Sequence, residues 1–315
     1  MSNSEFIQFV LENTDKPWDL VKLCANKNVT FEDKEVLEQH GLWSWTGFSS
    51  NPSVTLENLI TNTDKPWIWK DICASSAYVQ DMSKINPNIL ESFLDIISRN
   101  KVTEIDSSSN LSYSGLSWNP KLTLDFIVRN IDENWSWIGI SCTAPLTIPF
   151  MIKYEDKLDW ICVSHNPNLK LEHVLAFLES KPWNWSYLSR ILDVNLETVL
   201  QYSHIPWDFK EFCANKTLML NDVIQNPNLP WDYSTLSSNP NISIDFVRET
   251  VNKHPWNWSY LSMNPGISMH DIDDNPELPW KFSFVSKNPK LTLDFIKKHM
   301  DKTLNWKDIS SINLL

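Results

Sequence analysis

Glycine, paired cysteines and long apolar runs are scarce in this sequence. Its 315 residues include only 5 glycines, too few for a nucleotide-binding α/β enzyme, whose turns and phosphate loops need glycine. The 5 cysteines contain no Cys-x-x-Cys pair, so we expect buried free thiols rather than metal ligands or disulfides. No apolar run approaches the ~18–20 residues of a membrane span. The first residues lack the basic region and apolar core of a secretory signal, which predicts an intracellular protein.

Positive charge is also in deficit. The 27 Lys and Arg residues face 39 Asp and Glu residues, a net charge of −12, which argues against nucleic-acid and anionic-membrane partners. Motifs of metalloproteases, serine hydrolases, kinases and phosphate loops are absent. The acidic stretch 270–275 lacks the glycine of a calcium loop, and Pro276 follows it. The sequence therefore predicts no enzyme, no metal site and no cofactor.

Tryptophan and proline are abundant, and the tryptophans are periodic. The chain repeats the motif Trp-x-Trp-x-x-Leu-Ser-x-Asn-Pro-x-Leu-Thr-Leu-Asp about every 24 residues, about thirteen times. We therefore expect one continuous repeat array over 1–315. Residues 1–16 are interpreted as a half repeat or cap, 86–110 as a degenerate repeat or irregular loop, and 304–315 as a truncated last repeat. Counted from 0 at the first Trp, the motif starts at Trp18, Trp43, Trp67, Leu111, Trp135, Leu158, Trp183, Trp207, Trp231, Trp256, Trp280 and Leu304.

Most columns of the repeat have a structural interpretation. Of the 17 tryptophans, 16 stand at positions 0 and +2, and we expect them to form the core between repeats. The representatives are Trp43, Trp45, Trp183, Trp185, Trp256 and Trp258. Position +5 is always apolar. Position +6 is always Ser or Cys, which predicts a tight contact that a larger side chain would overpack.

Two short helices per repeat are expected, so the predicted fold is all-α, an α-solenoid. Thr or Ser at +12 is an expected N-cap for a second helix of about eight to ten residues. The first element follows Pro-Trp, with proline at the first helical position, and ends at Asn-Pro. A short α or 3-10 helix fits this length, although the Trp-x-Trp spacing would also suit a strand.

The motif carries two resemblances. Leu236-Ser-Ser-Asn-Pro-Asn-Ile and Leu261-Ser-Met-Asn-Pro-Gly-Ile resemble the leucine-rich-repeat variant, which implies a solenoid of alternating α and 3-10 helices. The sequence motif Pro-Trp-Asn-Trp-Ser-Tyr-Leu-Ser-x-Asn-Pro more closely resembles Trp- and Asn-Pro-rich repeat proteins of giant viruses of the mimivirus type. That resemblance covers nearly the whole chain and implies a viral protein made in host cytoplasm, with no assigned activity.

Recognition of another protein is the predicted function. The variable positions +1, +3, +4 and +7 would form the surface of a non-enzymatic scaffold. Its candidate partner residues are Trp118, His165, Arg190 and Met263. Trp118 stands out because it is the only tryptophan outside the two columns.

Two alternative functions stay open. The first is a self-assembling structural component of a virion or replication compartment. Residues 2–16 resemble the second helix of a repeat, and the sequence stops after 304–315 where the next Asn-Pro turn would begin, which favours end-to-end association. The second is stacking of single-stranded RNA bases on the tryptophan columns. The acidic charge weighs against RNA.

Overall fold

The described part of the chain folds into short helices and contains no strand. The computed structural model describes all residues except 1–2, 63, 69–70, 73–110, 121 and 313–315. These residues divide into two compact units, Leu20–Trp183 and a second unit made of Met1–Asp19 with Asn184–Leu315. The predicted all-α repeat fold is confirmed. No helix among the described residues has the length and apolar character needed to cross a membrane.

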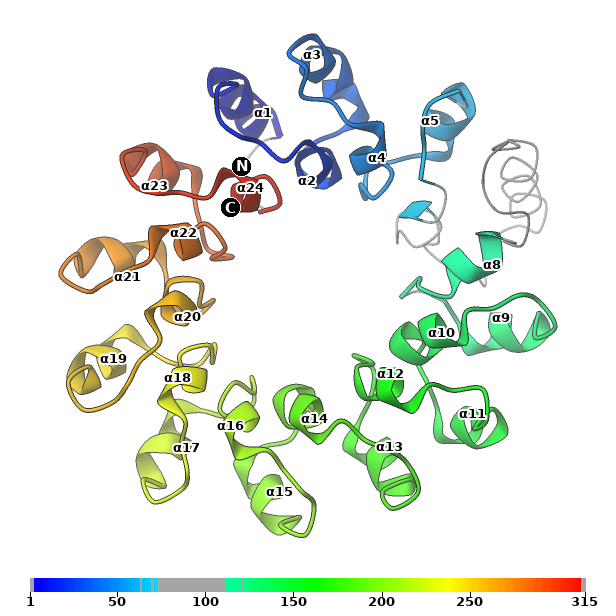
Figure 1. Ribbon diagram of the computed structural model, residues 1–315, viewed down its shortest axis with the longest axis vertical. Helices are drawn as coiled ribbons and strands as arrows, with labels where there is room; N and C mark the ends of the chain where they lie inside the picture. Colours follow the sequence, from blue (N-terminus) through cyan, green and yellow to red (C-terminus); the bar gives the residue numbers. More distant parts are fainter. Residues whose placement is uncertain (1–2, 63, 69–70, 73–110, 121, 313–315) are drawn as a thin grey trace. The chain divides into compact units, whose positions relative to one another are not determined.

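Each repeat contributes one helix to each of two rows within its unit (Figure 1). The first helices are α2 (Leu20–Ala25), α4 (Trp45–Phe48), α8 (Leu111–Leu116), α10 (Trp137–Thr143), α12 (Trp160–Ser164), α14 (Trp185–Ile191), α16 (Phe209–Phe212), α18 (Tyr233–Leu236), α20 (Trp258–Ser262), α22 (Phe282–Val285) and α24 (Trp306–Ile309). The second helices are α1 (Asn3–Glu12), α3 (Lys34–Gln39), α5 (Leu56–Thr61), α9 (Leu124–Arg129), α11 (Ile148–Lys153), α13 (Leu171–Ala176), α15 (Leu196–Gln201), α17 (Leu220–Gln225), α19 (Ile244–Thr250), α21 (Met269–Asp274) and α23 (Leu293–Lys298). Before α3 lies a single 3-10 turn, Phe31–Asp33.

The first element is an α-helix that begins at position +2, later than predicted. The side chain at +1 caps it; Asp208 Oδ1, for example, accepts a hydrogen bond from the Glu211 N–H at 3.1 Å. The prediction that proline is the first helical residue is therefore wrong. It lies at the centre of a tight turn in which the Trp67 N–H donates to the Lys65 carbonyl at 2.8 Å, and its fixed φ suits that turn. Position +1 is thus occupied by helix capping in most repeats and is not a free recognition position there, whereas Lys281 makes no cap hydrogen bond and Ile68 has no polar side chain.

The second helix is capped as predicted but is shorter, usually six or seven residues instead of eight to ten. Thr123 and Thr292 accept hydrogen bonds from the third backbone N–H of their helices. At the other end, the Asn130 side chain donates to the Phe126 carbonyl at 2.9 Å, and the Trp135 indole donates to the Asn130 carbonyl at 2.7 Å. Both carbonyls are satisfied without further helix, so the helix ends there.

Polar side chains at +6 and +8 join successive repeats. The Ser237 hydroxyl donates to the Tyr233 carbonyl at 2.8 Å and accepts a hydrogen bond from the Asn257 N–H at 2.8 Å. The +6 residue must therefore be small and also able to accept a hydrogen bond. The buried Asn239 side chain donates to three carbonyls of the preceding repeat at 2.9, 2.9 and 3.4 Å. Asparagine at +8 recurs in this role at Asn51, Asn166, Asn215, Asn264 and Asn288.

The tryptophan columns pack on each other across the repeat junctions. Trp183 and Trp256 are buried, whereas Trp43, Trp45, Trp185 and Trp258 are half-buried. Trp258 at +2 meets Trp280, the first residue of the next repeat, edge to face with centroids 5.4 Å apart. The predicted role of these residues in the inter-repeat core agrees with this packing.

One repeat is assembled from the two ends of the sequence. Phe9 of α1 stacks on Trp306 of α24, with centroids 6.1 Å apart, as Phe295 stacks on Phe282 at 6.2 Å within the preceding repeat. Trp306 also meets Trp18 edge to face at 5.3 Å. Residues 3–12 therefore serve as the second helix of the repeat that α24 begins, and we call this the split repeat.

The predicted division of the chain is only partly visible. Residues 86–110 lie outside the described residues, so the degenerate repeat expected there and the continuity of the array remain predictions. The acidic stretch 270–275 is not a loop, because it falls largely within α21. Asp273 in that stretch is paired with Lys298 at 2.8 Å and with His299 at 2.7 Å.

Candidate interaction surface

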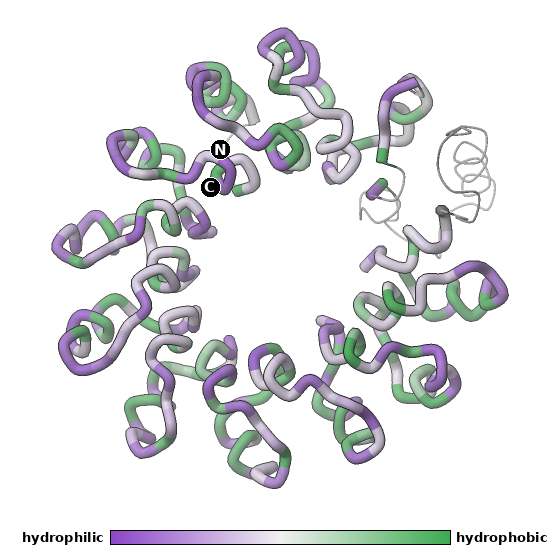
Figure 2. The backbone as a smooth tube through the Cα atoms, in the orientation of Figure 1, coloured by the Kyte–Doolittle hydropathy of each residue, from purple (hydrophilic) through white to green (hydrophobic). Residues whose placement is uncertain are grey.

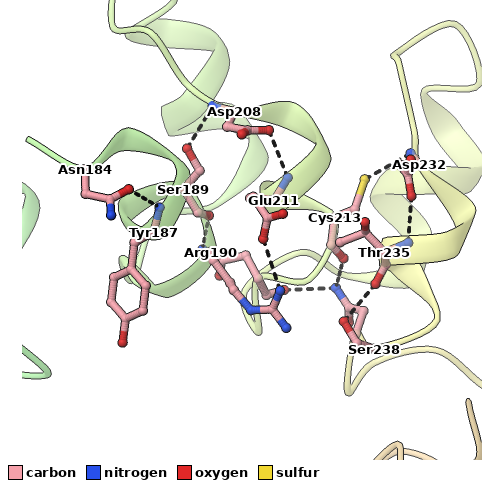
Figure 3. A network of polar contacts seen from close by, with 12 residues as sticks. Asn184, Tyr187, Ser189, Arg190, Asp208, Glu211, Cys213, Asp232, Thr235 and Ser238 are labelled. Carbon is pink, nitrogen blue, oxygen red and sulfur yellow. Dashed lines mark hydrogen bonds and ion pairs between the residues drawn. The ribbon is translucent and has the colours of Figure 1, made fainter. Parts of the chain in front are cut away.

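The exposed sides of successive first helices meet through positions +7 and +4. Arg190 on α14 pairs with Glu211 on α16 at 3.0 Å, as Figure 3 shows. The Ser50 hydroxyl contacts the Asp71 carboxylate at 3.3 Å from the same two positions. Side chains at +7 of one repeat and +4 of the next therefore face each other, and their chemistry differs from junction to junction.

All four predicted partner residues stand at +7. Arg190 is exposed and holds its ion pair with Glu211, whereas Trp118, His165 and Met263 are half-buried. The His165 ring Nδ1 lies 2.8 Å from the Ile161 carbonyl. Trp118 and His165 belong to the unit of residues 20–183, and Arg190 and Met263 to the other unit, so the structure does not gather them into one cluster.

Exposed aliphatic side chains at +3 were missed by the sequence analysis. Ile138 on α10 is 51% exposed and Ile161 on α12 is 58% exposed. In the unit that contains residues 184–315, the +3 residues are Ser186, Lys210, Ser234, Ser259, Ser283 and Lys307. The signal was a comparison within this one column, which is polar throughout that unit but aliphatic at Val21, Ile138 and Ile161 of the other unit.

Ile138 and Ile161 occupy the same position on neighbouring helices. Packed helices lie about 8–10 Å apart, which sets the spacing of equivalent side chains. Figure 2 shows α12 in green, the colour of hydrophobic residues, over most of its length. Trp118, at +7 of the repeat before α10, adds a half-buried aromatic residue next to Ser117, which lies close to Gly139 of α10. We call Trp118, Ile138 and Ile161 the apolar strip.

Two thiols lie beside the apolar strip. Cys142 on α10 and Cys162 on α12 occupy the +7 and +4 positions of successive repeats. Both are half-buried and free. Burial, together with the neighbouring Cys142 thiol and Asp159 carboxylate, raises the pKa of Cys162 to about 12, so its thiol stays protonated at neutral pH.

The other two described cysteines are structural. Cys24 and Cys213 are buried at +6, where their sulfurs replace the serine hydroxyl and accept hydrogen bonds from the N–H groups of Ser44 and Asp232 at 3.1 and 3.2 Å. Burial raises the pKa of each thiol to about 11. This agrees with the predicted buried thiols, whereas Cys142 and Cys162 are only half-buried and depart from that prediction. Cys73 lies outside the described residues.

Metal-ligating side chains do not gather in the part of the chain that the structure describes. No group of three or more His, Cys, Asp or Glu residues there could hold an ion. Comparison with known proteins adds no assignment, because no family model, no curated protein and no solved structure matches the chain. The chemistry of this surface must therefore be argued from its own residues.

Proposed function

We propose that this chain is a non-enzymatic protein–protein interaction scaffold, and that the apolar strip is its recognition surface. The exposed pair Ile138 and Ile161 carries the proposal. Single exposed aliphatic residues are common, but two in the same column on adjacent helices, with a half-buried tryptophan in the repeat before them, are expected to form one apolar surface. Such surfaces suit a partner that presents aliphatic or aromatic side chains.

The packing of the other aromatic residues supports this choice over RNA stacking. Trp67, Trp135 and Trp280 each stand first in their repeats. All three are buried, and the indole N–H of each donates a hydrogen bond to a backbone carbonyl. At +2, the rings of Trp45, Trp185 and Trp258 pack on the first Trp of the next repeat. Faces used in this way are not platforms for bases, and the net charge of −12 opposes a phosphate backbone.

End-to-end assembly remains a separate prediction. In the structure, α1 and α24 pack on each other within one chain. An assembly built on these surfaces would therefore require α1 of one copy to exchange its place with that of another. The resemblance to giant-virus repeat proteins supports a role in the host cell, where the partner would be found.

The proposal is tested with Ile138→Ser combined with Ile161→Ser. The matched control is Ile152→Ser on α11, in the same unit, because Ile152 is 60% exposed but lies in the row of second helices. Tagged proteins are recovered from the natural cell context, and each candidate partner is then titrated against purified protein by calorimetry. We expect at least about a tenfold loss of affinity in the double variant only, equivalent to about 1.4 kcal/mol. Equal binding by the double variant and wild type would contradict the proposal.

A further inference from the structure

A polar side chain at +15, the third residue of the second helix, bonds back to the start of that helix in several repeats. It accepts a hydrogen bond from the backbone N–H at +12, the N-cap residue. The acceptor oxygens of Asn58 and Asp271 lie 2.9 and 2.7 Å from the N-cap nitrogen in this way. The contact holds the first turn in place, so the acceptor at +15 contributes to the stability of each of these helices.

Helices α13 and α17 form a matched pair that depends on this acceptor. Their N-cap residues are Lys170 and Met219, and neither N-cap side chain makes a capping hydrogen bond. The Lys170 N–H donates to His173 Nδ1 at 3.0 Å, and the Met219 N–H donates to Asp222 Oδ2 at 3.0 Å. Both helices have six residues, so they differ at this contact in the acceptor, an imidazole in α13 and a carboxylate in α17.

The two acceptors respond differently to acid. Nδ1 of His173 can accept a hydrogen bond only while the ring is neutral and its proton is on Nε2. Protonation places a hydrogen on Nδ1 that points at the Lys170 N–H, so the bond is lost. The His173 side chain is only 7% exposed, and an imidazolium there is poorly hydrated. A carboxyl group keeps an acceptor oxygen in either protonation state, so Asp222 lacks this sensitivity.

We propose that His173 is an acid-sensitive cap, whose protonation breaks the hydrogen bond at the start of α13 and loosens that helix. Helix α13 belongs to the same repeat as α12, which carries Ile161 of the apolar strip. Acid therefore weakens the repeat that bears part of the proposed recognition surface. The inference stands without the proposed function, because it concerns only the stability of α13.

The pH range follows from the surroundings of His173. Burial lowers the pKa of its ring from the ordinary 6.5; the Glu172 carboxylate opposes this shift and the Lys170 ammonium adds to it. Of the charged groups in the described part of the chain, these two alone act on the ring. The cap is therefore complete above the ordinary pKa and is lost as the pH falls through the lower value of the folded protein.

The test measures amide hydrogen exchange of the full chain from about pH 7.5 to about pH 5, corrected for intrinsic exchange at each pH. Helix α17 is the internal reference for α13. We expect the protection of α13 to fall about three- to tenfold on acidification, the size of one hydrogen bond, while that of α17 stays constant. Equal responses of the two helices would overturn the proposal.

Two variants assign the effect to this side chain and not to the other histidines. His173→Asn keeps an uncharged acceptor, as Asn58 does in the same column, and is expected to make the protection of α13 independent of pH. Asp222→His is expected to transfer the pH dependence to α17, which tests the mechanism even if His173→Asn weakens the fold at every pH. A loss of protection in α13 of His173→Asn as large as in wild type, or an unchanged α17 in Asp222→His, would contradict the proposal.

Discussion

The split repeat and an interior repeat are joined to their neighbours by the same contacts, although the two helices of the split repeat are not consecutive in the chain. The Asp19 N–H donates to Ser310 Oγ at 3.1 Å, and the Asn305 N–H donates to Ser286 Oγ at 2.8 Å. Lys16 lies 5.8 Å over the Trp306 ring, as Lys302 lies 5.8 Å over Phe282. Side chains in register, rather than covalent succession, therefore specify which helices pair.

The difference between the two lies in how each can fail. An interior second helix is held at both of its ends by the chain, so it leaves its place only if its neighbours also rearrange. Residues 3–12 are tethered only on the C-terminal side among the described residues. They can undock alone, and local opening of this kind limits how much stability their contacts can lend to the rest.

The largest effect is expected when residues 1–16 are removed. Phe6, Ile7, Phe9 and Val10 are buried, and each contributes about 1.5–3 kcal/mol by burial. We expect a loss of about 5 kcal/mol or more in unfolding free energy and a red shift of Trp306 fluorescence. Urea unfolding followed by tryptophan emission measures both. A synthetic peptide of residues 1–16 should restore the emission, and the same peptide with Phe9→Ala should not.

A matched pair of phenylalanines compares the two kinds of repeat directly. Phe295 and Phe9 occupy the same column and are 3% and 2% exposed. Phe295→Ala is expected to lower the unfolding free energy by about 3–5 kcal/mol. Phe9→Ala should cost less globally, because α1 undocks first, and should speed amide exchange of residues 5–12. Equal global losses without faster exchange would show that the split repeat is as firmly closed as an interior one.

Breaking the asparagine link at an interior junction should have a slightly smaller effect. Asn288 donates to the carbonyls of Ser262, Asn264 and Ile267, each at 3.1 Å. Asn288→Ala leaves these buried acceptors unsatisfied, and we expect a loss of about 2–4 kcal/mol. Thermal unfolding measures it, with the exposed Lys290→Ala as control. A loss below that of the control would mean that water replaces the amide.

The smallest effect is expected from the junction serines. Ser286→Ala and Ser310→Ala each remove one acceptor for a backbone N–H, at an expected cost of about 1 kcal/mol. If the split repeat is bonded like the interior one, the two losses should agree within experimental error. Chemical denaturation with a common baseline resolves them, and a loss at Ser286 alone would show that the Ser310 bond contributes nothing.

Much of the fold could be predicted because the repeat states each structural requirement many times. Thr and Ser at +12 mark the N-caps, and small residues at +6 mark the close contact. The prediction that proline begins the first helix was wrong, because its fixed φ suits a tight turn before the helix as well as a first helical turn. The length of the second helix was overestimated because the hydrogen bonds of the Asn130 and Trp135 side chains that end it depend on contacts that a residue pattern does not show.

Less of the candidate surface could be predicted. The +7 column was identified as variable, and Trp118 within it, but Ile138 and Ile161 resemble ordinary core residues until their exposure is known. The Cys142 and Cys162 pair was missed because the two residues are 20 apart and become neighbours only through the register of two repeats. The likeness of residues 2–16 to a second helix was visible, but its partner α24 was not.

The split repeat also sets an order of events during synthesis. The Asp19 N–H and Ser310 Oγ are separated by 291 positions along the chain. At about 5–20 residues per second, residues 3–12 leave the ribosome about 15–60 s before their partner helix exists. Residues 3–12 thus wait for a partner that is made much later, and until α24 has been made their apolar face, with Phe6 and Phe9, is available to chaperones.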